Sequence, residues 1–418
     1  MNRTRRMLLG AAAAAPFARL AAPAIAQAQE IVWWSPNWGQ ARAEELIRRF
    51  QAENPGLRVK LEITVSDGLQ NRVLTALRSG SPPDLIDIQS GWNVPYAATG
   101  ELMALDEVAT QQGIALSDFL PAPLATARHD GRLVGIPYRC ESHALIYNKG
   151  AYREAGLNPD QPPQTWEAWV DAAKRLSRRT ADGRQAFGMG VCGGGEVGNM
   201  MFRAMPLIWM NGGTIISDDL RRALLSEPAA VEAVDFYCSF FTRHNAAPPS
   251  TLQNDGLALR RLFVAGTVAQ YQSGQFDIGA IRSENPNIEI GVARIPSPPG
   301  KETRAVLGGW NFVVPRQARA REGAAKLIGF LAKPENMGFY TDTFPARVSA
   351  MDLPRFRDPI LQPFREMLPF ARATPPLASW VQIVQLFFDH TQRILLREAT
   401  PQQAMNEANR AIQRLIDR

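Results

Sequence analysis

Residues 31–88 read IVWWSPNWGQARAEELIRRFQAENPGLRVKLEITVSDGLQNRVLTALRSGSPPDLIDI, and this stretch decides the fold class. An apolar run opens it, and apolar residues then recur at helical spacing from 43 to 50. Residues 57–65 alternate between apolar and polar side chains, a second helical pattern covers 69–77, and the apolar run at 85–88 closes the stretch. The order strand, helix, strand, helix, strand predicts the opening of an α/β lobe with a parallel sheet.

Two of the predicted strands end in segments rich in aromatic rings and neutral hydrogen-bonding groups. Residues 34–38 read WSPNW and residues 89–93 read QSGWN. Parallel α/β sheets bind ligands outside the carboxyl ends of their strands. Aromatic rings stack on the C–H faces of a polyhydroxylated ligand, while amides and hydroxyls pair with its hydroxyl groups. The sequence therefore predicts a ligand pocket formed in part by Trp34, Asn37, Trp38, Gln89, Ser90 and Trp92.

The first 28 residues have the features of a cleaved export signal. A basic head runs into an Ala-rich apolar stretch, and signal peptidase sites follow at Ala26 and Ala28. The pair Arg5-Arg6, with two leucines beyond it, resembles a twin-arginine signal, and an ordinary secretory signal is the alternative. The cleavage region contains no cysteine that could carry a lipid anchor. We therefore expect a soluble protein in the periplasm.

The mature chain is nearly neutral. The full sequence has 46 basic and 40 acidic residues, and four of the arginines lie in the signal. The high isoelectric point is therefore mostly a feature of the signal and does not indicate a nucleic-acid partner. About 390 mature residues are too many for a single hydrophobic core, so we expect two lobes.

Motifs for catalysis and metal binding are not found. Cys140, Cys192 and Cys238 leave at least one thiol unpaired and form no CxxC pair, which argues against a disulfide framework or a zinc site. The four histidines lack metal-ligand spacing with acidic residues, and neither a nucleophile elbow nor a phosphate-binding P-loop is present. We therefore predict no catalytic residue, no metal and no cofactor.

Residues 193–198 formally match the GxGxxG motif of dinucleotide sites, with Asp218 and Asp219 about 20 residues further on. Such short matches are common by chance, and this one lies in the middle of an exported chain. We interpret it as a cleft loop whose amides face the ligand.

Several further motifs occur in a fixed order. They are Gly135-Ile136-Pro137-Tyr138, Glu141, Leu145-Ile146-Tyr147-Asn148-Lys149, the helix entry at 162–167 with Thr165 as N-cap, Asn211-Gly212-Gly213, Phe263-x-x-Gly266-Thr267-x-Ala269, Gly308-Gly309-Trp310-Asn311 and Phe344-Pro345-Ala346-Arg347. Together with a C-terminal helical region, they span nearly the whole mature chain. This arrangement resembles the maltose-type solute-binding proteins of bacterial ABC importers, the extracellular solute-binding protein family 1.

The resemblance implies a two-lobed α/β fold of the periplasmic binding protein class, type II or Venus-flytrap. The chain of such a protein crosses between the lobes three times, and we place the crossings near residues 139–141, 305–308 and 344–346. The first lobe would comprise residues 29–139 and 308–344, and the second lobe residues 141–306 and 346–418. Ligand would lie in the cleft, and the lobes would hinge shut around it.

The resemblance also extends the expected site to the crossings and the second lobe. These further residues are Arg139, Glu141, Phe202, Trp209, Gln270, Gln275, Gly309, Trp310, Arg347 and Trp380. The fork of Arg139 or Arg347 suits a carboxylate, a phosphate or vicinal hydroxyls, and a hinge salt bridge is the equal alternative. Trp209 also fits a core position. Sugar binders of the family often carry Gly-x-Trp where this chain has Gly274-Gln275-Phe276, which weakens a maltose-like specificity.

The function implied is that of a non-enzymatic importer component. It would capture a sugar, an oligosaccharide, a sugar alcohol or a glycerol phosphate as a monomer, and deliver it to a permease dimer powered by an ATPase. An enzyme similar to thiaminase I stays an alternative, because Cys140 beside Glu141 could serve as a nucleophile. A chemoreceptor accessory or polymer-binding protein is a third possibility that the sequence does not separate.

Overall fold

The computed structural model describes residues 28–64, 66–181 and 183–417, and it begins with the alternation expected from the sequence. The expected export signal lies almost wholly outside these described residues. The first elements are β1 (Gln29–Pro36), α1 (Gln40–Glu53), β2 (Leu57–Thr64), α2 (Ser66–Ser79) and β3 (Leu85–Gln89). β1 pairs in parallel with both β2 and β3, which confirms the predicted parallel opening. The apolar stripe of α1 is buried, as its spacing requires.

The first lobe is built on a six-stranded mixed sheet with the order β12-β6-β11-β3-β1-β2. β6 (Ile136–Glu141) is antiparallel to both β11 (Gly308–Val313) and β12 (Phe344–Pro345), and β11 is also antiparallel to β3. The remaining elements of this lobe are α3 (Asn93–Ala97), α4 (Asp106–Gln111), α5 (Pro121–Thr126), β4 (Arg128–His129), β5 (Arg132–Leu133), α12 (Arg321–Leu331) and α13 (Pro334–Tyr340).

The second lobe has a three-stranded antiparallel sheet surrounded by helices. The strands are β7 (His143–Asn148), β8 (Gln270–Gly274) and β9 (Ile290–Ala293), in the order β8-β7-β9. The helices are α6 (Lys149–Glu154), α7 (Trp166–Leu176), α8 (Val197–Met210), α9 (Pro228–Thr242), α10 (Gly256–Val264), α11 (Phe276–Glu284), α14 (Gln362–Met367), α15 (Trp380–Leu395) and α16 (Pro401–Ile416). β10 (Ala305–Val306) and β13 (Ala371–Arg372) form a short parallel pair. Thr165 caps α7 by accepting a hydrogen bond from the amide of Ala168, as predicted.

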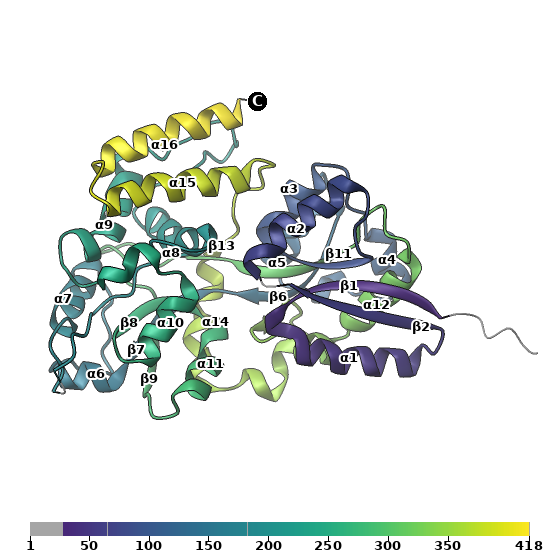
Figure 1. Ribbon diagram of the computed structural model, residues 1–418, viewed down its shortest axis with the longest axis horizontal. Coiled ribbons are helices and arrows are strands. Elements are labelled where there is room, and N and C mark those ends of the chain that lie inside the picture. The colour runs from purple at the N-terminus through teal and green to yellow at the C-terminus, as the bar shows by residue number, and fades with distance from the viewer. Residues whose placement is uncertain (1–27, 65, 182, 418) are drawn as a thin grey trace, which may run out of the picture.

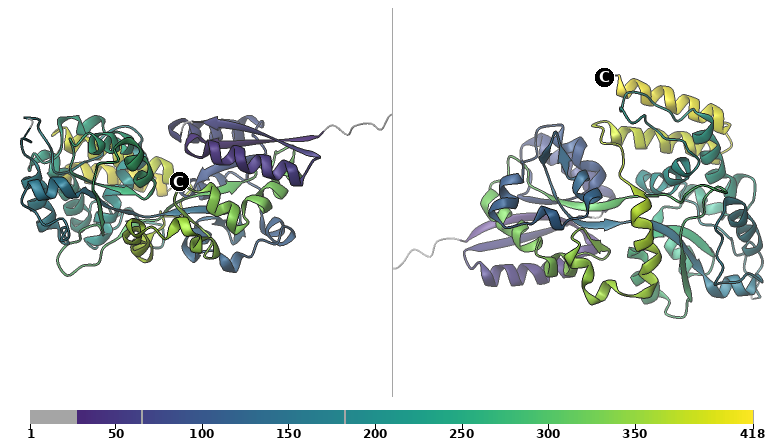
Figure 2. Two further views of the ribbon diagram at one scale, coloured as in Figure 1. Left: turned by 90° about the horizontal axis from the view of Figure 1, so that it is seen from below. Right: turned by 180° about the vertical axis from the view of Figure 1, so that it is seen from behind.

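Three segments run side by side between the lobes (Figures 1 and 2). β6 and β7 are separated by Ser142 alone, so one extended segment passes from the larger sheet to the smaller one. β11 and β12 flank β6, and Cys140 lies opposite both Gly309 and Phe344. This arrangement confirms the predicted fold class, a two-lobed α/β protein with three crossings.

The apolar core is divided in the same way as the sheets. One cluster of buried apolar residues draws on positions 31–138 and 310–346, and the other on positions 140–307 and 344–412. Each lobe therefore has its own core, assembled from segments that are distant in sequence. Among the described residues, no helix is both long enough and apolar enough to span a membrane.

Candidate ligand-binding cleft

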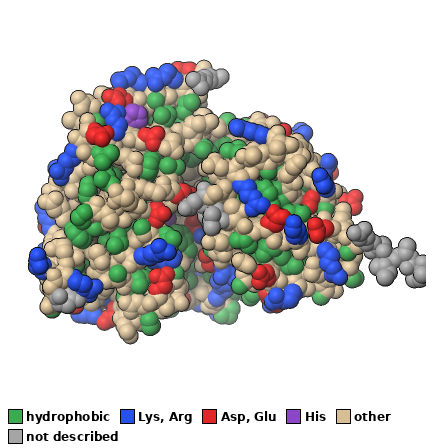
Figure 3. Space-filling model, in the orientation of Figure 1, with side chains coloured by type: hydrophobic (Ala, Val, Ile, Leu, Met, Phe, Trp, Pro, Cys, Tyr) green, Lys and Arg blue, Asp and Glu red, His purple; other side chains and the backbone are tan. Residues whose placement is uncertain are grey.

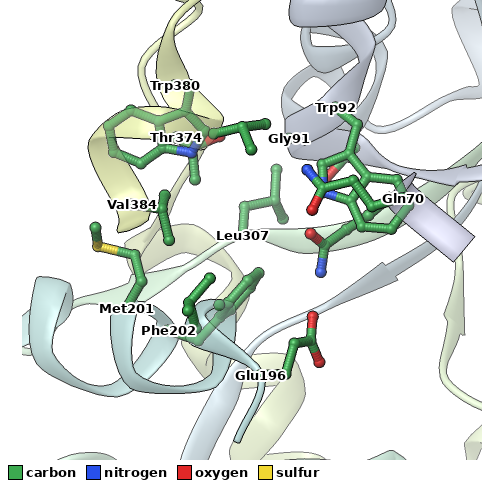
Figure 4. Close-up of a pocket in the computed structure, with 15 residues that line it drawn as sticks. Gln70, Gly91, Trp92, Glu196, Met201, Phe202, Leu307, Thr374, Trp380 and Val384 are labelled. Atoms are coloured by element: carbon green, nitrogen blue, oxygen red, sulfur yellow. The ribbon is translucent and has the colours of Figure 1, made fainter. Parts of the chain in front are cut away.

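A pocket lies where the two lobes face each other (Figures 3 and 4). Its volume is about 590 Å³, including the part that is open to solvent. The first lobe contributes α2 and the turn after β3, and the second lobe contributes the start of α8 and the start of α15. The lining residues are Gln70, Gln89, Ser90, Gly91, Trp92, Glu196, Val197, Gly198, Met201, Phe202, Leu307, Thr374, Trp380, Val381 and Val384.

Aromatic rings line the pocket from both lobes. Trp92 comes from the first lobe, and Phe202 and Trp380 come from the second, as Figure 4 shows. The lobes come close at the rim, because a Cβ built on Gly91 would lie 4.0 Å from Cδ1 and Nε1 of Trp380. A ligand held between these rings contacts both lobes at once, which is what closure around a ligand requires.

A row of aromatic rings leads from the pocket towards the crossing strands. The ring centroids of Trp92 and Trp310 are 5.9 Å apart, and those of Trp310 and Trp38 are 5.6 Å apart. Beyond them, the guanidinium carbon of Arg139 lies 4.4 Å from the centroid of the Trp38 ring. Four of the predicted site residues, Trp38, Trp92, Arg139 and Trp310, are thus brought together through consecutive contacts.

Arg139 forms a buried cluster with two carboxylates. Its Nη2 lies 2.6 Å from Glu141 Oε2, and its Nη1 lies 2.7 Å from Asp342 Oδ1. Burial opposes the charge of Arg139, but Asp342 and Glu141 outweigh burial and keep its pKa above the ordinary value. Burial raises the pKa of Glu141, although Arg139 opposes that shift. The hinge salt bridge between Arg139 and Glu141, one of the two sequence-based alternatives, is therefore present.

Residues 193–198 contribute to the pocket with their last three positions. Glu196, Val197 and Gly198 line it at the start of α8. The amides of Gly193 and Gly194 both donate to the carbonyl of Asn254, at 3.1 Å each, so they are used within the lobe. This corrects, for Gly193 and Gly194, the expectation that the glycine amides of this loop face the ligand.

The sixteen predicted site residues fall into three groups. Gln89, Ser90, Trp92, Phe202 and Trp380 line the pocket. Trp38, Arg139, Glu141, Gln275, Gly309 and Trp310 surround the crossing strands next to it. Trp34, Asn37, Trp209, Gln270 and Arg347 are absent from both groups.

The residues of the third group that are not exposed have other partners. The indole of Trp34 donates to Glu62, and Gln270 accepts from Tyr152 inside the second lobe. Arg347 pairs with Asp118, its Nε lying 2.7 Å from Oδ2. Trp209 lies at the far end of α8, where Arg372 approaches its ring. Asn37 is exposed.

Sequence reasoning missed part of the pocket wall. These residues are Gln70, Gly91, Glu196, Val197, Gly198, Met201, Leu307, Thr374, Val381 and Val384. Gly91 and residues 196–198 belong to segments that had been singled out, and Leu307 lies at a predicted crossing. Gln70, Met201 and Thr374 carry no motif that could have identified them.

Cys140 is enclosed by the crossing strands. Its side chain is fully buried, and the Sγ atom lies 3.5 Å from the carbonyl oxygen of Pro345. Burial, reinforced by the charge of Glu141, raises the pKa of this thiol. A catalytic cysteine needs a lowered pKa and access to its substrate, and this environment provides neither. Within the described ranges, no group of three or more His, Cys, Asp or Glu residues could hold a metal ion.

Comparisons with known proteins agree with this geometry. A family model described as bacterial extracellular solute-binding protein matches residues 35–338. A Brucella abortus (strain 2308) protein, named only as a candidate binding protein, is 27% identical over 371 residues, with 87% of each chain covered. The sn-glycerol-3-phosphate-binding periplasmic protein UgpB of Escherichia coli (strain K12) is 25% identical over 415 residues, with 90% of each chain covered. An ABC transporter solute-binding protein from Thermotoga lettingae, solved with α-D-tagatose, has a TM-score of 0.85 at 25% identity and covers 93% of this chain and 100% of its own.

Proposed function

The chain belongs to the family of bacterial extracellular solute-binding proteins, and on this premise we propose that it is the substrate-binding component of an ABC importer. It captures a small hydroxylated solute between its lobes and delivers it to a membrane permease dimer with its ATPase. The observation that carries the proposal is the pocket between the lobes, with Trp92 from one lobe and Trp380 from the other.

The proposed ligand class is a carbohydrate, a sugar alcohol or a glycerol phosphate. The relatives support this range, since one is named as an sn-glycerol-3-phosphate-binding protein and another was solved with α-D-tagatose. The lining supports it independently, because aromatic faces lie next to the neutral polar groups of Gln70, Gln89, Ser90 and Thr374.

We propose that residues 29–139 with 308–344, and residues 141–306 with 346–418, form the two lobes that close around the ligand. The two large clusters of buried apolar residues support this division, and a third, smaller cluster, which includes Tyr147 and Tyr152, lies within the second lobe. The short crossing segments support a hinge at the level of Ser142, whose hydroxyl donates to the carbonyl of Phe364 in the second lobe.

The proposed role is binding without catalysis. The family consists of binding proteins, and the burial of Cys140 weighs against the thiaminase-like alternative. We further propose that the twin-arginine signal at residues 1–28 exports the chain to the periplasm, where it acts as a monomer. Replacing Arg5 and Arg6 by lysine should retain the protein in the cytoplasm, and an ordinary secretory signal would tolerate the exchange.

The experiment that tests the function is a thermal-shift screen of the exported protein, followed by calorimetry on each compound that raises the melting temperature. A ligand at about 100 times its dissociation constant stabilises a folded protein by about 2.7 kcal/mol. We expect saturable binding of one compound per protein molecule and quantitative recovery of that compound unchanged. Conversion of the bound compound would instead support an enzyme.

A further inference from the structure

We propose that the cleft takes an uncharged polyhydroxylated ligand and excludes phosphate esters, with Gln272, Gln275 and His143 as a neutral hydrogen-bonding floor behind Phe202. This inference rests on the proposed binding function and narrows its ligand class. On this proposal, the chain differs from its glycerol-phosphate-binding relatives in the charge of the ligand that its site accepts.

The charge of the pocket opposes a phosphate. None of the fifteen described residues that line it is a lysine or an arginine, whereas Glu196 adds a carboxylate at its edge. That carboxylate accepts a hydrogen bond from Asn199 Nδ2 at 2.9 Å, which fixes its place at the start of α8. Phosphate sites commonly use Arg or Lys, whose charge-assisted hydrogen bonds are strong, and a nearby carboxylate repels the dianion.

Arg139 and Arg72 pair with carboxylates, whereas the buried Arg203 donates to the carbonyl oxygens of Gln272 and Asn199. Arg139 faces two carboxylates, Glu141 and Asp342, so this buried cluster offers no net positive charge to a ligand. Arg72, two residues beyond the lining residue Gln70, lies 2.7 Å from Glu62 Oε2 and stacks over Trp34 at 3.7 Å. Turning Arg139 towards a phosphate would leave the buried Glu141 without its cation.

The floor carries buried polar atoms that lack a hydrogen-bond partner. Both side-chain polar atoms of Gln272 are unpaired, as are Oε1 of Gln275 and Nδ1 of His143, and the three residues are between 0% and 4% exposed. A buried polar atom without a partner costs free energy, so such atoms are rare unless a ligand or water pairs with them.

These three residues lie together. His143 of β7 is directly opposite Gly274 of β8, so Gln272, two residues earlier on β8, projects from the same face. Gln275 follows Gly274 and reaches the crossing strand, its Nε2 lying 3.4 Å from the carbonyl oxygen of Cys140. The ring of His143 lies 5.5 Å from the ring of Phe202, which lines the pocket. The floor is therefore one side chain behind the pocket wall.

The groups of the floor are neutral and can both donate and accept. Burial, together with the charge of Arg203, lowers the pKa of His143 well below its ordinary value, so its imidazole is uncharged at neutral pH. Two amides and a neutral imidazole match hydroxyl groups, which also donate and accept. The oxygens of a phosphate dianion accept hydrogen bonds and donate none. They therefore cannot pair with the acceptor atoms of Gln272, Gln275 and His143.

The test measures binding of matched pairs to the exported protein by calorimetry. The probes are D-tagatose with D-tagatose 6-phosphate, maltose with maltose 1-phosphate, and glycerol with sn-glycerol 3-phosphate. We expect at least one uncharged probe to bind about tenfold or more tightly than its phosphate ester. If a phosphate ester binds more tightly than its uncharged partner, the proposed preference for uncharged ligands is wrong. The proposed importer function would not be affected by that result. Failure of every probe to bind would count against the importer function and this inference together.

A variant then tests the floor. Gln272→Met keeps the length of the side chain and removes its unpaired atoms. If these atoms serve the ligand, the variant should have an unchanged or higher melting temperature and bind the best uncharged probe about tenfold more weakly. A purely structural role would instead lower the melting temperature and spare affinity, and that result would overturn the proposal.

The matched control is Thr391→Val on α15. Thr391 is also fully buried with an unpaired hydroxyl, and it does not line the pocket. We expect this control to keep the affinity of the best probe. Glu196→Gln should raise the affinity of the phosphate probe relative to its uncharged partner, and an unchanged ratio would contradict the part assigned to Glu196.

Discussion

Arg139 and Asp342 form an ion pair at the junction of the lobes, with Nη1 2.7 Å from Oδ1, although Arg139 lies in the first crossing segment and Asp342 precedes the last. The same guanidinium also holds Glu141. Replacing Arg139 by methionine would leave the buried Glu141 without its cation and Asp342 with only the more distant Arg42, 4.0 Å away. We expect a loss of roughly 3–5 kcal/mol in the free energy of unfolding, measured with urea. Arg139→Lys should lose less, and a loss in Arg139→Met below about 1 kcal/mol would contradict a structural role for the cluster.

Asp87 makes stability depend on pH. It is fully buried and accepts hydrogen bonds from Trp33, Tyr138 and Tyr340. Burial raises its pKa to about 7 against the lowering effect of these donors. Because the folded pKa exceeds the unfolded value of about 3.9, the stability that Asp87 contributes is full below pH ~4 and is lost as the pH rises through 7.

Asp87→Asn removes this titration. The unfolding free energy of the natural chain, minus that of the variant, should fall by on the order of 2–4 kcal/mol between pH 4 and pH 8. Urea titrations at several pH values measure this difference, in which the other carboxylates cancel. A difference that stays constant with pH would show that the carboxyl group keeps its ordinary pKa.

Gly91 sets how closely the lobes approach. Its Cβ position lies 3.4 Å from Thr374 Oγ1 and 4.0 Å from Trp380, so a methyl group fits there and a larger side chain does not. Gly91→Leu should hold the cleft open and weaken ligand binding about tenfold or more, whereas Gly91→Ala should stay within about threefold. Calorimetry gives the affinities, and small-angle scattering with ligand should show a larger radius of gyration for the leucine variant. Equal affinities would mean that closure does not bring these residues together.

The three cysteines should not react with thiol reagents in the native protein. Cys140, Cys192 and Cys238 are all free and buried. A thiol reagent such as DTNB should therefore react with none of them in the folded chain and with three after denaturation. Cys140→Ala should keep ligand affinity. Rapid modification of Cys140 in the native state would reopen the enzyme alternative.

Two of the tryptophans predicted to bind the ligand should behave differently. Trp92 lines the pocket and Trp209 does not. Trp92→Ala should weaken binding of the best ligand roughly ten- to thirtyfold, as loss of a buried aromatic contact usually does. Trp209→Ala should leave the affinity within about twofold and lower only stability. Comparable losses in both variants would place Trp209 at the ligand.

Much of the fold was predictable because its signals are local. The periodicity of residues 31–88 predicts two helices and three strands within a few residues of where they lie, and the Thr165 cap follows from the preference for such residues at a helix start. The three crossings were located through short motifs rather than through periodicity, since a strand such as Phe344–Pro345 is too short to give a pattern.

The pocket was predictable only where strand ends define it. Gln89, Ser90 and Trp92 follow β3 directly, so their place follows from the sheet. On α8, Phe202 and Trp209 lie seven residues apart on one stripe, and periodicity cannot distinguish them. They are separated by two turns, roughly 10 Å along the axis, and only Phe202 is near enough to the start of the helix to line the pocket. Thr374 enters from a segment without regular structure, where no sequence pattern applies.

The pairing of β6 with β11 and β12 also limits when the sheet of the first lobe can form during synthesis of the chain. When β6 leaves the ribosome, both of its neighbours remain to be synthesised, so the sheet of the first lobe has unpaired edges. That sheet is completed only when Pro345 emerges, close to the end of a chain of 418 residues. The first lobe therefore cannot complete its sheet until most of the second lobe has been synthesised. Until then its unpaired strand edges can pair with other chains.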